Sequence, residues 1–274
     1  MVENRQLRAG AIAPSILRLL LSGGMGACLL LSGCAQSQAV RVGHVIGVKK
    51  ENIAEYKKLH ADVWPDVLKT IAKGNIRNYS IYLGGAEEGA DDLYLFSYFE
   101  YVGSDWEADM AKIAADKTTQ EWWKHTDPLQ VPLSTRKKGE WWSQWKEVFH
   151  HGGPPHQCPN PKRVAMIIGL NPEPEKIIAY TQLHAAVWPG VLDAIDKSNI
   201  RNYSIYHGEL APGKHLLFGY FEYVGEDFDA DMGRMAQDKV TQVWWSYTNP
   251  LQIPLPTRAE GEHWTTMEEV FHTD

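Results

Sequence analysis

The chain has 274 residues, of which 44% are hydrophobic and three are cysteines, and its formal net charge is −7 at pH 7. This acidic balance, with no cluster of lysine and arginine interleaved with aromatic residues, excludes a nucleic-acid-binding surface. Three cysteines cannot form a disulfide framework, so the fold must be held together by its apolar core.

Residues 1–33 have the pattern of a secretion signal and not of a folded segment. Three arginines precede the apolar stretch 19–31, which is too short to span a membrane comfortably. The stretch ends in Leu-Ser-Gly-Cys, which resembles a bacterial lipobox, so lipid on Cys34 is expected to anchor an exported protein to a bacterial membrane, on its periplasmic or cell-surface side. Residues 34–40 would then be a polar tether. The alternative is an ordinary signal peptide with a chance cysteine.

After the tether, the sequence predicts the order strand, helix, strand, strand, helix, strand. Apolar side chains at helical spacing predict a helix over 52–73, in which Pro65 either introduces a kink or separates two helical segments. A second helix follows Asp105, and a shorter helical segment carries two adjacent tryptophans. Apolar and alternating runs predict four strands, over 42–49, 77–83, 93–101 and 145–150.

The same pattern then returns. Residues 56–82 recur 124 residues later as 180–206, with 19 of 27 positions identical. This period is far longer than that of stacking repeats, so each copy is predicted to be a domain. We place the first copy at 41–150 and the second at 162–274. Residues 151–161 are rich in proline and glycine and are predicted to be the linker.

A βαββαβ order, as in ferredoxin-like folds, gives an antiparallel sheet with both helices on one face. The other face is apolar and can be buried against the sheet of the second copy. The prediction is therefore an α+β fold in which two repeats pair within one chain as an intramolecular dimeric α/β barrel. This arrangement has a pseudo-twofold axis and two equivalent pockets.

Each copy carries a histidine between two aromatic residues on its first helix. His60 follows Tyr56 by four residues and precedes a tryptophan by four, and His184 has the same relation to Tyr180. Residues four apart share a helix face, so the three rings are expected to form a column that faces the sheet. A histidine in such a partly dry place suits proton transfer near neutral pH. The alternative is a core histidine with both ring nitrogens hydrogen-bonded.

Other aromatic residues recur in both copies. Strand alternation predicts that Tyr79 and Tyr82, like Tyr203 and Tyr206, point to opposite sheet faces, so one of each pair can reach the histidine. Adjacent tryptophans cannot both face the core from one helix, so at least one of each pair is available to stack on the C–H face of a sugar. The alternatives are core packing for the tyrosines and packing between the halves for the tryptophans. The two tryptophan pairs are Trp122–Trp123 and Trp244–Trp245.

The order Tyr-x-x-x-His-x-x-x-Trp-Pro, Asn-Tyr-x-Ile-Tyr, Trp-Trp and Glu-Val-Phe resembles the L-rhamnose mutarotase family of small dimeric α+β barrel proteins. The resemblance spans nearly the whole of each copy. It implies that His60 and His184 are the proton donors. It also implies two sugar-binding sets, one of Tyr56, Tyr79, Trp122 and Trp123 and the other of Tyr180, Tyr203, Trp244 and Trp245. The family is usually a single cytoplasmic copy that self-associates, whereas this chain is duplicated and has the N-terminal pattern of an exported protein.

The function that the resemblance implies is that of an aldose 1-epimerase, which interconverts the anomers of L-rhamnose or a similar deoxyhexose by histidine acid/base ring opening. Its partner is a monosaccharide, and it requires no cofactor. Two other functions stay open, a non-catalytic surface sugar-binding lipoprotein and a dimeric α/β-barrel monooxygenase or isomerase for a hydrophobic substrate. No metal site is predicted, because ligand-like spacing is absent among His150, His151, His156 and Cys158.

Overall fold

The computed structural model describes residues 39–87, 89 and 92–274. The predicted signal segment 1–33, the lipidation residue Cys34 and the tether up to residue 38 lie outside the described residues. None of the helices in the described part of the chain is both long and apolar enough to cross a membrane.

The first repeat contains the strands and helices that its sequence predicts, with short additional elements before the last strand. Its elements are β1 (Val40–Lys49), η1 (Lys50–Asn52), α1 (Ile53–Ala61), α2 (Pro65–Lys73), β2 (Ile76–Gly84), β3 (Asp92–Tyr101), α3 (Trp106–Ala115), α4 (Lys117–Thr126), η2 (Asp127–Leu129), β4 (Gln130–Val131) and β5 (Ser143–His151).

The second repeat has the same order, and its last strand is interrupted. Its elements are β6 (Lys162–Leu170), α5 (Pro174–Ala185), α6 (Pro189–Lys197), β7 (Ile200–Ala211), β8 (Lys214–Tyr223), α7 (Phe228–Gln237), α8 (Lys239–Thr248), η3 (Asn249–Leu251), β9 (Gln252–Ile253), β10 (Thr265–Thr266) and β11 (Glu268–Thr273).

The predicted helix over 52–73 is two helices. Helix α1 ends at Ala61, the backbone leaves the helical region at Asp62, and Pro65 is the first residue of α2. Proline is favourable at this position because its fixed φ suits a helix start and its missing N–H has no partner to lose. Of the two outcomes that the sequence left open, separation into two segments is the one found, and α5 and α6 repeat it around Pro189.

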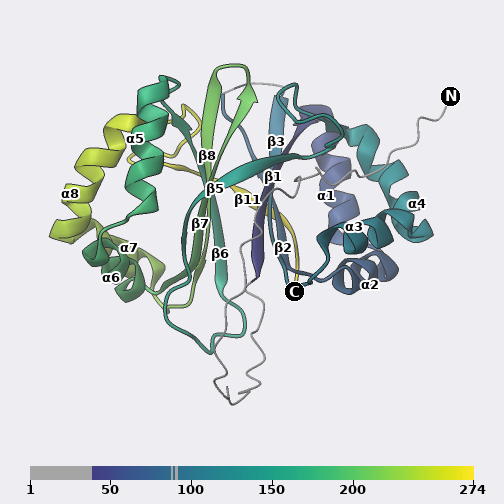
Figure 1. Cartoon of the computed structure of the whole chain (residues 1–274), viewed down its shortest axis with the longest axis horizontal. Coiled ribbons are helices and arrows are strands. Elements are labelled where there is room, and N and C mark those ends of the chain that lie inside the picture. Colours follow the sequence, from purple (N-terminus) through teal and green to yellow (C-terminus); the bar gives the residue numbers. More distant parts are fainter. Residues whose placement is uncertain (1–38, 88, 90–91) are drawn as a thin grey trace, which may run out of the picture.

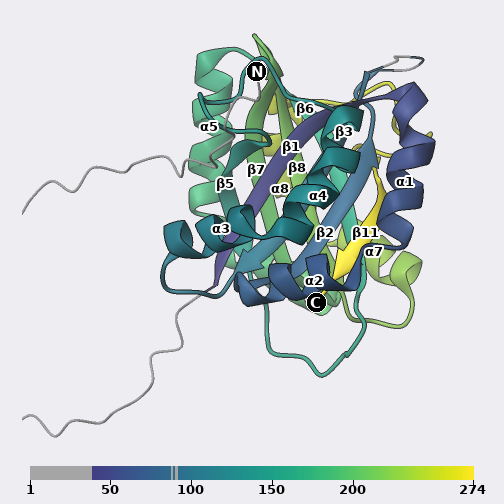
Figure 2. The same cartoon turned by 90° about the vertical axis from the view of Figure 1, so that its right-hand side faces the viewer.

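The strands form one antiparallel sheet, in which the order is β10-β6-β8-β7-β5-β1-β3-β2-β11. Helices α1 to α4 cover one flank and α5 to α8 the other, with the strands between them (Figure 1). Seen from the side, the first set of helices lies in front of the sheet (Figure 2). This is the predicted α+β barrel of two repeats.

The last strand of each repeat crosses into the other repeat, which the sequence did not predict. Strand β5 begins beside β1, where Trp145 is opposite Gly43, and continues beside β7, where His151 is opposite Tyr203. Strand β11 lies beside β2 of the first repeat, while β10, just before it, pairs with β6. The single sheet is therefore joined across the two repeats by strands from both copies, and the barrel is built by both copies together.

The barrel interior is an apolar core built from both repeats. It contains Phe96 and Phe218, whose ring centroids are 5.4 Å apart, and Trp145, which packs edge-on against Phe96 at 5.7 Å. The opposite faces of the strands pack on the helices and form further apolar clusters. Burial of apolar surface on both faces of the sheet is the main force that stabilises this arrangement.

A polar network lies where the two repeats meet. The amide nitrogens of Asn78 and Asn202 each donate to Oε1 of both Glu100 and Glu222, over 2.6 to 3.0 Å. The two asparagines have φ of 49° and 48°, a left-handed conformation that asparagine tolerates better than most residues. Because each amide serves a carboxylate from both copies, the network fixes the position of one repeat relative to the other.

Candidate functional site

Helix α1 places the imidazole of His60 directly on the ring of Tyr56. The ring centroids are 4.0 Å apart and the planes differ by 20°, as residues four apart on one helix allow. The Nδ1 atom of His60 lies 2.9 Å from the carbonyl oxygen of Tyr56. Since a carbonyl can only accept, Nδ1 carries the hydrogen, and Nε2 of a neutral imidazole is left with its lone pair.

The second repeat builds the same pair. His184 stacks on Tyr180 with a centroid distance of 4.0 Å and a plane angle of 23°, and its Nδ1 lies 3.0 Å from the Tyr180 carbonyl oxygen. Both tyrosines are almost completely buried, at 1% and 0% exposure, whereas both histidines keep some exposed surface. The histidines thus sit at the solvent side of each pair.

Aromatic rings enclose each histidine from other elements. Trp122 on α4 is buried and meets His60 edge-on at 5.6 Å. Trp64 also contacts Trp122, at 5.4 Å, but from the turn before α2 and not from the helix that carries His60. The predicted column of three rings on one helix is therefore wrong for its tryptophan, because the helix ends at Ala61. The second repeat has the same tryptophan contacts.

Tyr79 reaches the same cluster from β2. Its ring packs edge-on against Phe271 at 5.4 Å and Phe99 at 5.5 Å, while Tyr82 points into the barrel interior. The alternation predicted from the strand is confirmed. Tyr203 and Tyr206 divide in the same way, with Tyr203 packed among the helix-facing residues.

The adjacent tryptophans separate as expected for one helix. Trp122 is buried beside His60, whereas Trp123 is only half-buried and packs against a neighbouring cluster that includes Phe99. Tyr79 contacts this second cluster as well as the first. Of the four residues predicted to bind sugar in this half, Tyr56 and Trp122 therefore contact His60 directly, Tyr79 packs on Phe271 in the same cluster, and Trp123 lies in the adjoining cluster.

Each cluster also contains a phenylalanine from the other repeat. Phe271, on β11 of the second repeat, lies 5.7 Å edge-on from His60 of the first, and Phe149 on β5 lies 6.0 Å from His184. The recurring Glu-Val-Phe-His sequence marks both residues, but a local pattern does not show which sheet a strand joins. Each candidate site is consequently built from both copies.

Burial controls the protonation of these groups. Loss of hydration lowers the pKa of His60 and of His184 to about 4, which the hydrogen bond to the tyrosine carbonyl partly opposes. Burial likewise raises the pKa of Tyr56 and of Tyr180 well above the ordinary value for tyrosine. At neutral pH the histidines are therefore neutral bases and the tyrosines are neutral hydroxyls.

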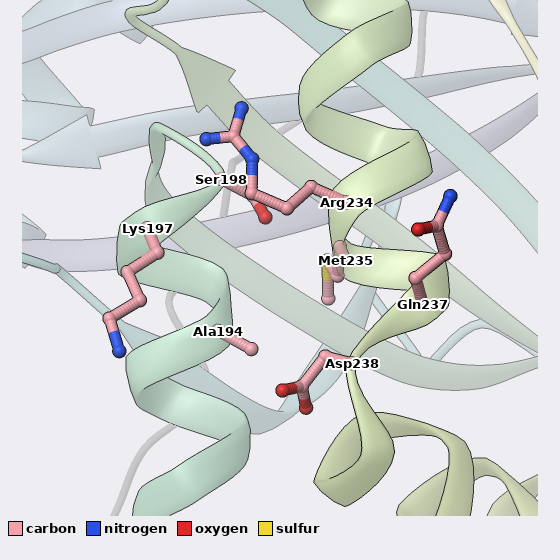
Figure 3. Close-up of a pocket in the computed structure, with 7 residues that line it drawn as sticks. All are labelled: Ala194, Lys197, Ser198, Arg234, Met235, Gln237 and Asp238. Atoms are coloured by element: carbon pink, nitrogen blue, oxygen red, sulfur yellow. The ribbon is translucent and has the colours of Figure 1, made fainter.

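A surface depression of about 310 Å³ lies elsewhere, between α6 and the end of α7 in the second repeat (Figure 3). It is lined by Ala194, Lys197, Ser198, Arg234, Met235, Gln237 and Asp238. It shares no residue with either histidine-centred cluster. It also lacks aromatic side chains, so it does not suit the stacking of a sugar ring.

Among the described residues, no group of three or more histidine, cysteine, aspartate or glutamate side chains is arranged to hold a metal ion. The histidines in and next to the linker have separate partners. His150 is hydrogen-bonded to Ser204, and Nε2 of His151 is hydrogen-bonded to Oδ1 of Asp196 over 2.7 Å.

The fold and the site together define an internally paired α/β-barrel protein with a histidine inside an aromatic cluster in each half. A sequence model of the L-rhamnose mutarotase family matches the chain twice, over residues 41–151 and 163–273. The chain belongs to the L-rhamnose mutarotase family, in tandem duplicate, and it is an enzyme of the carbohydrate epimerase type.

Individual relatives agree with this assignment. The L-rhamnose mutarotase of Lactiplantibacillus plantarum is 31% identical over 117 residues, which are 40% of this chain and 97% of that protein. The L-rhamnose mutarotase of Bacteroides thetaiotaomicron is 30% identical over 123 residues, 41% of this chain and 99% of that protein. Each relative thus corresponds to one repeat.

The likeness to a solved structure extends over most of the fused chain. This structure, from Fusobacterium nucleatum and described as a presumed monooxygenase, covers 86% of this chain and 95% of its own, with a TM-score of 0.51 and 13% sequence identity. At this identity the likeness concerns the fold alone.

Proposed function

We propose that each half of the chain holds a mutarotase site, which interconverts the α and β anomers of L-rhamnose or a similar deoxyhexose. The observation that supports this most directly is the stacked tyrosine–histidine pair with a fixed imidazole tautomer, present twice. Aromatic rings around it offer flat faces for the C–H groups of a sugar, and tyrosine hydroxyls offer hydrogen bonds for its polar edge.

The mechanism follows from the protonation states. Neutral His60, through Nε2, takes the proton of the anomeric hydroxyl as the bond between C1 and the ring oxygen breaks. The ring oxygen takes a proton from a bound water or a tyrosine hydroxyl. After rotation about C1–C2, the ring closes. The hydroxyl that becomes the ring oxygen returns its proton to the water or tyrosine that supplied it, and the imidazolium returns its proton to the oxygen on C1. In the closing direction the histidine is therefore a proton donor, and His184 acts in the same way in the other half.

The reaction needs only a moderate contribution from the protein, because it also proceeds unaided in water. Positioned proton transfer contributes about 10²- to 10⁴-fold in rate, or about 3–5 kcal/mol of barrier. One titratable group with a fixed tautomer, in a site that orients the sugar, is sufficient for this.

The test is NMR exchange between the α and β H1 signals of L-rhamnose at anomeric equilibrium, with and without the protein. Exchange should be accelerated by the native chain and return to the uncatalysed rate in the His60→Ala/His184→Ala double variant. Each single variant should keep about half of the acceleration if both pockets work. His156→Ala in the linker is the matched control and should keep the native rate. A double variant with native exchange would refute the role of the histidines.

Rates measured against pH test the same role independently. A base with a pKa of about 4 is unprotonated above pH 6, so the acceleration should be constant there and fall as the pH approaches 4. Sugar signals that broaden without exchange would instead indicate a binding protein. If L-rhamnose shows neither exchange nor broadening, other sugars should be tested.

We also propose that residues 1–33 direct export and that lipid on Cys34 anchors the enzyme to a bacterial membrane. The run Leu-Ser-Gly-Cys after an apolar stretch supports this. Cell fractionation should find the native chain with membranes and a Cys34→Ala variant in the soluble fraction. Equal distribution of the two would contradict the anchor.

A further inference from the structure

A glutamine lies beside the buried tyrosine of each site. The sequence alone did not point to it. Gln130 opens β4, where it pairs with Val48 of β1, and the turn before it is held by a hydrogen bond from Asn52 to the Leu129 carbonyl. In the second repeat, Gln252 opens β9 beside Leu170. Both side chains are half-buried and have defined partners.

The orientation of the Gln130 carboxamide follows from its neighbour. The indole Nε1 of Trp141 donates to Oε1 of Gln130 over 2.7 Å. Because an indole N–H can only donate, the glutamine oxygen must face Trp141 and its NH₂ group must face the other way. His263 occupies the position of this tryptophan in the second repeat, with Nε2 at 2.9 Å from Oε1 of Gln252.

The NH₂ group is directed at the tyrosine under the catalytic histidine. In the second repeat, Nε2 of Gln252 donates to the hydroxyl oxygen of Tyr180 over 3.5 Å, a long bond. In the first repeat, burial and Tyr79 raise the pKa of Tyr56, and Gln130 lies close enough to lower it slightly. The Tyr56 hydroxyl nevertheless has no partner within hydrogen-bond geometry in the residues that the structure describes. Both glutamines therefore present a donor, and not an acceptor, to the tyrosine.

A tyrosine oxygen that faces a donor must turn its own hydrogen elsewhere. The hydroxyl of Tyr56 is fully buried and finds no hydrogen-bond partner within the described part of the chain. A buried hydroxyl without a partner is unfavourable, so its hydrogen is available for an acceptor that arrives with a ligand. The rings of His60 and Tyr56 are stacked, so such an acceptor would lie close to the imidazole.

We infer that Gln130 and Gln252 are positioning residues. Each presents its NH₂ group to the tyrosine oxygen, so that the hydroxyls of Tyr56 and Tyr180 donate to an oxygen of the bound sugar. This inference rests on the proposed mutarotase function and extends it. Trp141 and His263 act through the glutamines; they hydrogen-bond to the glutamines and so fix the direction in which each glutamine points.

The test replaces both glutamines by glutamate. This change keeps the size and the acceptor for Trp141 and His263, but it turns the donor toward the tyrosine into a second acceptor, which captures the hydroxyl hydrogen. KM for the sugar, from the dependence of exchange on L-rhamnose concentration, should rise roughly tenfold, the effect expected when a buried hydrogen bond is lost. The maximal rate should change much less, because the histidines are intact.

Two exchanges between the copies serve as matched controls. Trp141→His and His263→Trp each introduce the residue that the other repeat already uses, and both keep a ring N–H toward the glutamine, so KM should stay native. Trp141→Phe/His263→Phe removes both donors and should raise KM. Thermal unfolding of every variant separates these effects from loss of the fold.

The outcomes distinguish the two proposals. If the native chain does not accelerate exchange, the mutarotase function fails, whatever the glutamine variants do. If the native chain is active and the Gln130→Glu/Gln252→Glu variant is folded with native KM, the positioning role is refuted. A variant with a native KM and a lower maximal rate would also refute it, because the tyrosine would then not act in sugar binding.

Discussion

Tyr56 and His60 illustrate what a four-residue spacing on a helix determines. The spacing predicts that the two rings share one face, and they stack at 4.0 Å. The same reasoning failed for Trp64, four residues further on, because the helix ends at Ala61 and proline starts a new one. Local periodicity predicts contacts within one helix, but a position beyond a helix break depends on how the next element packs.

His44 is a half-buried titratable residue that only one copy has. It lies on β1 opposite Ser97, with its ring 5.4 Å from Phe99, and Met166 occupies the matching place in the second repeat. Loss of hydration lowers the pKa of His44 to about 4, whereas the unfolded chain has a value near 6.5. Between these values the unfolded state binds more protons, so stability is complete above pH 6.5 and declines as the pH falls toward 4.

We therefore expect His44→Met to weaken the pH dependence of stability. The urea midpoint of the variant should fall less than that of the native chain between pH 7 and pH 4.5. Stability at pH 7 should change little, because methionine already fills the equivalent site in the other repeat. An identical loss in both proteins would show that His44 does not contribute to acid sensitivity.

At the scale of elements, the strands were predictable and their partners were not. Alternation in β2 correctly placed Tyr79 and Tyr82 on opposite faces. Nothing in the residues of β5 reveals that it leaves β1 and continues beside β7, because a strand sequence specifies which face is buried and not which neighbour it joins. The presence of Phe149 and Phe271 in the opposite sites was unpredictable for the same reason.

Glycines in the sheet accommodate the crossing strand. A Cβ added to Gly208 would lie 2.4 Å from ring carbons of Trp145, which β5 brings from the first repeat. Overpacking of this kind costs about 1–3 kcal/mol. We expect Gly208→Ala to lower the free energy of unfolding by this amount, as measured by urea denaturation. A variant as stable as the native chain would show that Trp145 can move aside.

Gly233 provides the matched control, because it lies within helix α7 and an added Cβ would meet nothing within 4 Å. The first repeat has Ala111 at the equivalent helix position. Alanine is the better helix former, so Gly233→Ala should stabilise the protein by roughly 0.5–1 kcal/mol. The two substitutions are chemically identical and are expected to have effects of opposite sign.

At the scale of the whole molecule, the exchanged strands and the shared asparagine–glutamate network join the copies into one cooperative structure. If the linker is cut between Pro155 and Cys158 at an engineered protease site, we expect the two fragments to remain together in size-exclusion chromatography. Thermal unfolding of the cut protein should still show one transition. Fragments that elute separately would mean that the linker, and not strand exchange, holds the halves together.

Strand exchange within one chain also has a consequence for assembly at low concentration. A short connection gives the two copies an effective concentration in the millimolar range, and their association does not depend on the amount of protein present. Two separate chains with the same exchanged strands would dissociate on dilution and lose Phe149 and Phe271 from the opposite sites. The duplicated chain keeps both sites complete even when a single molecule is far from any other.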